Sequence, residues 1–172
     1  MAIVRTGEHT FKGKPLTLVG PRLQVGDKAP DFRLIDRSLL IVGLKDTPAK
    51  VRIVSVVPSL DTPVCDLQAR RFNEEAGGFG DKVAVYTVSR DTPFAQGRWC
   101  GQADAKNMTV LSDIYDGSFG DAYGVHILEM GLLCRSVFVI DAAGSVRHAQ
   151  YVPEFTDLPD YHAALTAVRG LL

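Results

Sequence analysis

The sequence predicts an α/β protein in which helices flank a mixed β-sheet, with a β-hairpin at the N-terminus. Three observations lead to this fold class. Two strand–helix units follow one another in the middle of the chain, a pair of strands and a helix end it, and a separate hairpin begins it. Successive strand–helix units favour parallel strands with right-handed crossovers, whereas hairpins contribute antiparallel strands. The sheet is therefore expected to be mixed.

The N-terminal hairpin is predicted from Thr10-Phe11 and residues 15–19, which lie on either side of Lys12-Gly13-Lys14. Gly13 permits a tight turn between the two strands. Residues 26–32 then indicate a turn that leads to a short strand, and residues 39–44 are a candidate for another.

The first strand–helix unit is the clearest in the chain. Residues 51–57 are largely apolar and rich in β-branched side chains, as expected of a central strand covered on both faces, and Pro58 ends the run. Thr62 is a good N-cap and Pro63 fits the first helical position. A helix is expected from there to about Ala76, where Gly77-Gly78 can end it.

The second unit repeats this pattern. Residues 83–88 are the next predicted strand, and Asp91-Thr92-Pro93 opens a second helix with the same three residue types that open the first. A third strand is expected at residues 108–111.

The C-terminal part supplies the antiparallel strands. A strand is expected at residues 133–140, a turn at 141–144, a returning strand at 146–152 and an amphipathic helix from Pro159 to about residue 169. Parallel units followed by a hairpin and a final helix are typical of a thioredoxin-like sandwich. Since no linker or low-complexity tract divides the chain, residues 1–172 are expected to form a single domain.

Composition excludes several classes of function. The chain has 19 Lys and Arg against 20 Asp and Glu, so it lacks the basic excess typical of nucleic-acid binding. Its uncharged apolar stretches are far shorter than the roughly 20 residues of a membrane span. The N-terminus lacks the long apolar region of a secretory signal. We expect a cytoplasmic protein that binds neither nucleic acid nor membrane.

The cysteines do not form a metal site or a disulfide framework. Their number is odd, they are widely spaced, and Cys-x-x-Cys does not occur; they are Cys65, Cys100 and Cys134. The histidines do not lie at zinc-finger spacing from them, and they are expected to be solvated surface residues: His9, His126, His148 and His162. Gly-x-Gly-x-x-Gly and phosphate-loop motifs do not occur either, so no metal and no nucleotide or flavin cofactor is expected.

Cys65 lies in the first turn of the first predicted helix, three residues after Thr62. Unpaired backbone N–H groups and the positive end of the helix dipole face this position, and both favour a thiolate over a thiol. The position alone leaves two interpretations open, which are a reactive nucleophile and a small buried hydrophobic residue.

Several segments, in the same order as in the family, resemble the peroxiredoxins, in the version found in bacterial thiol peroxidases. Residues 58–65, Pro-Ser-Leu-Asp-Thr-Pro-Val-Cys, resemble the active-site loop, with its Pro-x-x-x-Thr-x-x-Cys core. Residues 93–100 resemble the helix of the resolving cysteine, and residues 131–141 resemble the strand that carries an arginine. Residues 26–32 resemble the opening segment. Together with the N-terminal hairpin, the resemblance covers nearly the whole chain.

The resemblance implies an atypical two-cysteine peroxidase that reduces hydrogen peroxide and organic hydroperoxides. Cys65 would attack the peroxide and become a sulfenic acid, and Cys100 would resolve it as an intramolecular disulfide that thioredoxin reduces. The resemblance also implies a homodimer. In such a dimer Val64, Phe94 and Trp99 are candidate interface or pocket residues.

Three further residues receive roles from the resemblance. Thr62 would place its hydroxyl against the thiolate and the peroxide, Pro58 would shield the site, and Arg135 would hold the thiolate and polarise the peroxide oxygens. Each has a structural alternative: a helix N-cap for Thr62, a strand terminator for Pro58 and an exposed strand end for Arg135.

Resolution by Cys100 requires a change of conformation. A disulfide needs Cα atoms within about 7 Å of each other, which two consecutive helices do not guarantee. The Cys100 helix, the first turn at Cys65, or both are therefore expected to unwind locally during turnover. Gly97 and Gly101 weaken the Cys100 helix, which fits this expectation. The structural alternative for Cys100 is a second buried cysteine.

Three residues depart from the family pattern. Cys134 stands where a small apolar residue is usual, and by strand alternation it faces away from Arg135. We expect a buried bystander, with a regulatory thiol as the alternative. Arg90 and Thr92 also depart, and Arg90 is expected to be a solvated loop residue rather than a source of positive potential at the site.

Two competing functions use the same cysteine. One is a cysteine hydrolase in which His126 or His148 serves Cys65 as the base. The other is a redox-sensing or holdase protein that uses the Cys65–Cys100 disulfide as a switch.

Overall fold

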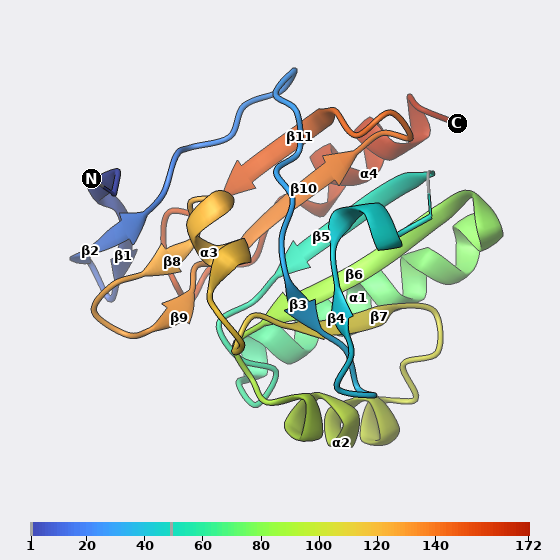
Figure 1. Cartoon of the computed structure of the whole chain (residues 1–172), viewed down its shortest axis with the longest axis horizontal. Coiled ribbons are helices and arrows are strands. Elements are labelled where there is room, and N and C mark those ends of the chain that lie inside the picture. Colours follow the sequence, from blue (N-terminus) through green and yellow to red (C-terminus); the bar gives the residue numbers. More distant parts are fainter. Residues whose placement is uncertain (1, 49) are drawn as a thin grey trace.

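The computed structural model describes residues 2–48 and 50–172, and it has the expected mixed sheet flanked by helices (Figure 1). The main sheet has the strand order β11-β10-β5-β6-β7-β3-β4. Its parallel strands are β5 (Val51–Val56), β6 (Val83–Ser89) and β7 (Thr109–Ser112). The antiparallel strands at its two edges are β10 (Ser136–Ile140), β11 (Val146–Tyr151), β3 (Leu34–Ile35) and β4 (Ile41–Val42). The predicted fold class is confirmed.

A second, smaller sheet extends the predicted N-terminal hairpin. Its order is β1-β2-β8-β9, with β1 (Val4–Phe11), β2 (Lys14–Val19), β8 (His126–Ile127) and β9 (Leu132–Leu133). The hairpin is confirmed, and Lys12 and Gly13 at its turn both have positive φ. Its pairing with β8 and β9 was not predicted, because strands of two residues have too little pattern to be found in a sequence.

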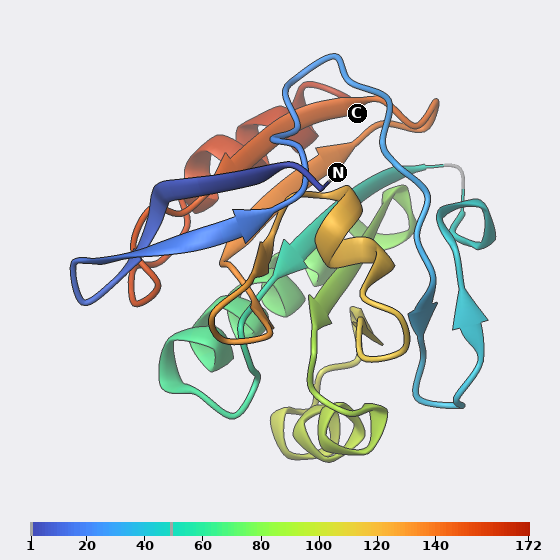
Figure 2. The ribbon, with the colours of Figure 1, turned by 60° about the vertical axis from the view of Figure 1, so that its left-hand side comes forward.

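The helices divide between the two faces of the main sheet (Figure 2). The three longer ones pack with one face and are α1 (Pro63–Phe79), α2 (Pro93–Ala103) and α4 (Tyr161–Arg169). The short helix α3 (Ser118–Ala122) and strands β2, β8 and β9 pack with the other face. Two 3-10 turns, η1 (Leu44–Asp46) and η2 (Gly80–Lys82), precede β5 and β6.

Residues of the central strands alternate between these two faces. In β5, Ile53 joins the cluster under α1, whereas Val54 joins the cluster under α3. In β10, Val137 and Val139 face the α1 side, and Phe138 faces the other. Both strands are buried on both faces, which explains their nearly continuous apolar runs.

Two predicted boundaries are wrong. Helix α1 does not end at Gly77-Gly78 but continues to Phe79, and the chain leaves it at Gly80 with φ +55°. Glycine weakens a helix without ending it, whereas a positive φ is a conformation that glycine adopts at little cost. The strand expected at residues 133–140 is two strands in different sheets, β9 and β10, which are separated by Cys134 and Arg135.

Candidate active site

Cys65 lies where β5 passes into α1. The strand is followed by Pro58, which is buried, and the helix begins with Thr62 as its N-cap and Pro63 at its first position, as predicted. Cys65 is the third residue of the helix, and its side chain is fully buried. The buried side chain therefore belongs to the turn whose backbone N–H groups lack partners within the helix, at the positive end of the helix dipole.

The pairing of β5 with β10 places Arg135 next to Cys65. Ser136, the first residue of β10, is opposite Val56, the last residue of β5, so the residue before β10 meets the start of α1. Arg135 is 1% exposed, and its Nη2 donates to the Cys65 sulfur at 3.4 Å. The exposed strand end considered for Arg135 is thereby excluded. A buried guanidinium in contact with sulfur stabilises a thiolate.

Backbone and side-chain acceptors fix the guanidinium. Nη2 also donates to the Phe155 carbonyl at 3.1 Å, and Nη1 donates to Oε1 of Gln68 at 2.9 Å. The Arg135 carbonyl accepts from the Val152 N–H at 2.9 Å. The Nε of Arg135 is buried and makes no hydrogen bond within residues 2–48 and 50–172, so one N–H of the fork is available to another acceptor near the sulfur.

Gln68 is a site residue that the sequence analysis missed. It is fully buried, one turn after Cys65 on α1. Its Nε2 donates to the Ser55 hydroxyl at 2.8 Å and to the Val56 carbonyl at 3.3 Å, while its Oε1 accepts from Arg135. Gln68 thus ties α1 and β5 to the arginine. The available signal was a polar residue three positions after Cys65, on the same face of the helix.

The Thr62 hydroxyl forms its hydrogen bond with the loop that precedes α1 and not with the Cys65 sulfur. It donates to the Ser59 carbonyl at 2.9 Å, and it does not cap a helix N–H although Thr62 is the N-cap residue. The Thr62 carbonyl does accept from Asp66 in the first turn. The predicted N-cap position is right, and the side-chain capping bond that usually accompanies it is replaced by a bond within the loop.

Cys100 lies on α2, in the same apolar cluster as Cys65, and both are free thiols. It is 6% exposed, and burial raises the pKa of the Cys100 thiol. The cysteine also borders a cavity of about 200 Å³ beside the turn between β3 and β4 and strand β7. The Cys100 carbonyl accepts from Asp104 and Ala105, where the helix ends in a left-handed residue.

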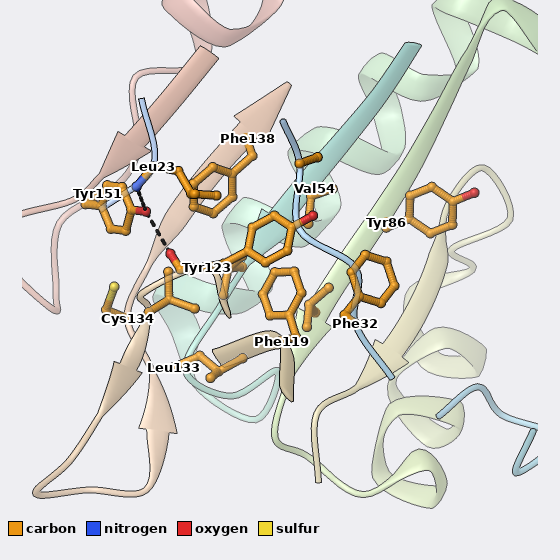
Figure 3. Packing of buried hydrophobic residues seen from close by; sticks show 14 of the residues in the cluster. Leu23, Phe32, Val54, Tyr86, Phe119, Tyr123, Leu133, Cys134, Phe138 and Tyr151 are labelled. Atoms are coloured by element: carbon orange, nitrogen blue, oxygen red, sulfur yellow. Dashed lines mark hydrogen bonds between the residues drawn. The ribbon is translucent and has the colours of Figure 1, made fainter. Parts of the chain in front are cut away.

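Cys134 belongs to the opposite face of the sheet. Its side chain is fully buried among apolar residues that include Leu133 and Tyr151, in the cluster drawn in Figure 3. Burial raises the pKa of Cys134 to about 12. The prediction that Cys134 faces away from Arg135 is confirmed, since Arg135 contacts Cys65 in the other cluster. Burial therefore favours the protonated thiol of Cys134 over the thiolate, which is the nucleophilic form of a cysteine.

Two expectations about charged groups are wrong. Arg90 is not a solvated loop residue, because its side chain is 17% exposed and its Nε pairs with the buried carboxylate of Asp113 at 3.3 Å. Its Nη1 donates to the Gly131 carbonyl. His9 is not a surface residue either: it is 1% exposed and its Nδ1 bonds the Val152 carbonyl at 2.9 Å. Both groups have fixed partners from distant segments, which local sequence does not reveal.

The histidines named for a hydrolase do not serve Cys65. His126 bonds Asp121 through Nδ1 at 3.0 Å, and the Nε2 of His148 is buried without a hydrogen-bond partner among the described residues. Among the residues that the structure describes, the hydrogen bond to the Cys65 sulfur comes from Arg135. Arg135 is a cation and cannot accept the thiol proton, so this contact does not fit a mechanism in which a histidine base removes that proton.

Burial of His9 predicts a loss of stability in acid. Burial lowers the pKa of His9, while the Val152 carbonyl and the charge of Glu154 oppose this and the charge of Arg135 adds to it. An unfolded histidine titrates near 6.5. Below that pH the unfolded chain binds a proton that the native chain does not, so the free energy of unfolding falls with falling pH, by at most about 1.4 kcal/mol per unit.

Urea unfolding of wild type and His9→Leu between pH 8 and pH 5 measures this effect. The free energy of unfolding of the wild type minus that of the variant should be constant above about pH 7. Below that pH this difference should decrease as the pH falls. Because burial also lowers the pKa of His148, the variant keeps part of the slope. If the free energies of unfolding of the two proteins ran parallel over the whole pH range, His9 would not contribute to the pH dependence of stability.

The described residues contain neither a cluster of three or more His, Cys, Asp or Glu side chains able to hold a metal ion, nor a helix that is long and apolar enough to cross a membrane.

Comparisons with known proteins identify the family of the chain. The Redoxin family model matches residues 24–165. The chain is 53% identical over 165 residues to a thiol peroxidase of Bacillus subtilis (strain 168), which covers 96% of this chain and 98% of that protein. It is 53% identical over 163 residues to a thiol peroxidase of Halalkalibacterium halodurans, with 95% and 98% covered.

Among solved structures, a peroxiredoxin-like protein from Aquifex aeolicus superposes with a TM-score of 0.89 at 40% identity, covering 99% of both chains. Family, sequence relatives and structure agree over almost the whole length of the chain. The chain therefore belongs to the Redoxin family and, within it, to the thiol peroxidases, which makes it a peroxidase enzyme of the peroxiredoxin type.

Proposed function

We propose that the protein reduces hydrogen peroxide and organic hydroperoxides, with Cys65 as the peroxidatic thiolate. The observation that carries this proposal is the buried guanidinium of Arg135 on the sulfur of a cysteine in the first turn of a helix. The Cys65 sulfur attacks the terminal peroxide oxygen, the O–O bond breaks, and the remaining oxygen leaves as water or an alcohol after taking up a proton. The sulfur loses two electrons and becomes a sulfenic acid.

The groups around Cys65 have distinct roles in this step. Arg135 stabilises the thiolate through Nη2, and its unpaired Nε–H is a donor for the peroxide oxygens, on which negative charge develops. The Thr62 hydroxyl donates to the Ser59 carbonyl, which leaves its oxygen able to accept a hydrogen bond from the peroxide. Pro58 is buried at the end of β5 and shields the site from water. Gln68 keeps the guanidinium in place.

Cys100 is the resolving cysteine of the proposal. Its sulfur attacks the sulfur of the Cys65 sulfenic acid, an S–S bond forms, and the hydroxyl group leaves as water. Burial raises the pKa of Cys100 in the folded helix, so the same local unwinding that lets it reach Cys65 also removes the cause of that shift. Two electrons from thioredoxin then reduce the disulfide and return both thiols.

Unwinding of α2 predicts that a stiffer helix resolves more slowly. Gly101 is helical and an added Cβ meets nothing within 4 Å, so Gly101→Ala should stabilise α2 by about 1 kcal/mol and lower the unwound fraction about fivefold. Disulfide formation after one equivalent of peroxide, followed by mass spectrometry, should slow by that factor. Gly78→Ala, which is equally unobstructed but lies in α1, is the control. Equal rates in all three proteins would contradict unwinding as a required step.

The test of the proposed function is peroxide consumption driven by thioredoxin, its reductase and NADPH. Wild type should turn over, Cys65→Ser should be inactive, and Cys100→Ser should stop after about one oxidation per chain. Normal cycling of Cys100→Ser would remove Cys100 from the mechanism. Oxidation of the wild type without sustained turnover would favour the redox-sensing or holdase function, and no peroxide consumption would overturn the proposal.

The remaining parts of the proposal concern assembly. We propose that residues 1–172 form one domain, which the matches over 96% and 99% of the chain support, and that the protein acts as a homodimer. Of the three candidate interface residues, Phe94 is 74% exposed and Val64 is half-buried, so both remain candidates. Trp99 is buried and its Nε1 donates to Asp66, which makes it part of the fold instead. Sedimentation of wild type and Phe94→Ser tests this assignment.

A further inference from the structure

The carboxylate of Asp91 connects the loop of Cys65 with the end of β6, just before the helix of Cys100. Its Oδ1 accepts from the Ser59 hydroxyl at 2.7 Å, and its Oδ2 accepts from the Leu60 N–H at 2.8 Å. Oδ2 also accepts from the Ser89 hydroxyl at the end of β6, at 2.7 Å. These are short bonds to a charged acceptor, and two of them hold the loop between Pro58 and Thr62.

Ser59 transmits this anchoring to Thr62. While its hydroxyl is bound to Asp91, its carbonyl accepts from the Thr62 hydroxyl at 2.9 Å and from the Thr62 N–H at 3.2 Å. The direction of the Thr62 side chain therefore depends on the orientation of Ser59, which Asp91 fixes from outside the loop.

The same residue anchors the beginning of α2. Asp91 directly precedes the N-cap Thr92, and its carbonyl accepts from the Ser112 hydroxyl at 2.5 Å. One turn into the helix, Gln96 donates to the Ser89 hydroxyl at 3.0 Å and to the Leu111 carbonyl at 2.9 Å. The first half of α2 is thus bound to β6 and β7 by buried polar groups.

Within residues 2–48 and 50–172, the second half of α2 has no comparable side-chain hydrogen bonds to the sheet. Arg98 pairs with Asp61 at 3.2 Å, and both side chains are about 60% exposed, so this pair is weak. Trp99 donates to Asp66 of α1. Cys100 follows, with Gly97 and Gly101 on either side. Asp91 consequently lies at the boundary between a fixed and a weakly held part of the helix.

We propose that Asp91 is a positioning residue. Through Ser59 it holds the Cys65 loop and Thr62 in the geometry for peroxide attack, and through its bonds to Ser89 and Ser112 it keeps the start of α2 fixed while the part that carries Cys100 unwinds. This inference rests on the proposed function. It adds a residue that touches neither the substrate nor the sulfur atoms and that serves both half-reactions.

The experiment uses the Cys100→Ser background, in which Cys65 can be oxidised but no disulfide with Cys100 can follow. Stopped-flow fluorescence of Trp99, the only tryptophan of the chain, follows the reaction with hydrogen peroxide. Asp91→Asn should lower the second-order rate constant about tenfold or more, because small displacements of positioned groups cost that much. Ser59→Ala should lower it as well. The double variant should be no slower than the slower single variant, since one residue acts through the other.

A second readout does not depend on peroxide. Cys65 is fully buried, so its alkylation by iodoacetamide requires the loop to open. Asp91→Asn should speed up alkylation of Cys65, identified by peptide mass, while it slows oxidation by peroxide. A general loss of nucleophilicity would slow both reactions. Opposite changes are therefore specific to a loosened loop.

Asp141→Asn is the matched control. The Asp141 carboxylate also accepts from two backbone N–H groups, those of Ala143 and Ser145, in a turn at the far end of β10. Asp141→Asn should lower the free energy of unfolding and leave the rates of Cys65 oxidation and Cys65 alkylation unchanged.

Unchanged oxidation and alkylation in Asp91→Asn would overturn the inference, and so would strictly additive effects of Asp91→Asn and Ser59→Ala. If hydrogen peroxide does not oxidise the wild type, the proposed function fails, and the alkylation rates alone then decide whether Asp91 holds the loop. If Asp91→Asn does not fold, Ser59→Ala and Ser59→Thr decide the question. The hydroxyl of Thr should restore the rates that Ala changes, and equal rates in these two variants would count against the inference.

Discussion

Replacing Arg135 by methionine is expected to slow the oxidation of Cys65 by hydrogen peroxide by about 10²–10³-fold. The guanidinium is 1% exposed and contacts the Cys65 sulfur at 3.4 Å, so it acts in a medium where charge is screened little. Methionine fills much of the same volume and removes both the charge and the donors. In the proposed mechanism, this loss affects the thiolate before the reaction and the peroxide oxygens during it.

Arg135→Lys separates charge from geometry. A lysine keeps the positive charge, but one ammonium group cannot reproduce a planar fork that serves Gln68, Phe155 and Cys65 from different nitrogen atoms. We expect this variant to recover only part of the loss. Full activity would mean that charge alone is sufficient.

The measurement needs a control for the removal of any buried arginine. Arg52 lies at the start of β5, is 5% exposed, and donates to the Thr47 hydroxyl and the Asp141 carbonyl. Arg52→Met should lower the free energy of unfolding and leave the rate of Cys65 oxidation unchanged, since it is at the opposite end of the strand from Cys65. A rate for Arg135→Met within about threefold of the wild type would contradict the proposed role of Arg135.

The sequence predicted the position of Cys65 in the first turn of α1 correctly, because that position depends on local residues. Thr62 and Pro63 define the start of α1, and the position of Cys65 in the first turn follows from them. Arg135 could not be placed in the same way. Its burial depends on the antiparallel pairing of β10 with β5, between segments about 80 residues apart, and on the carbonyl of Phe155. Without the family resemblance, an exposed strand end was an equally good interpretation.

The same contrast explains which elements were missed. Strands β5 and β6 have long β-branched runs, and α1 and α2 have Pro at the first position, so local sequence suffices to predict them. Helix α3 has five residues and depends on a group outside it: the carboxylate of Asp113, which pairs with Arg90, accepts from the Phe119 and Gly120 N–H groups at its first turn. Local propensity does not reveal an element whose stability comes from tertiary contacts.

The junction between the N-terminal hairpin and the segment after α3 shows how closely such distant segments approach. Gly124 has φ +65°, and a Cβ at this position would lie 1.9 Å from the Pro21 carbonyl oxygen. Gly20 has φ +100°, and its Cβ would lie 1.9 Å from the Asp121 carbonyl oxygen. Arg5 donates to the carbonyls of both glycines. The two backbones are therefore in direct contact, and a side chain on either one would separate them.

Gly124→Ala is accordingly expected to lower the free energy of unfolding by about 3 kcal/mol or more, the sum of the left-handed backbone penalty and the clash with Pro21. Gly131→Ala is a close control, because Gly131 has φ +64° and a Cβ there meets nothing within 4 Å. It should cost only the backbone penalty of about 1–2 kcal/mol. In thermal unfolding, Gly124→Ala should melt at least several degrees below Gly131→Ala, since about 1 kcal/mol corresponds to 2–4 °C at this chain length. Equal melting temperatures would mean that the hairpin moves away from the loop at little cost, and that the close approach of the two backbones is not required for stability.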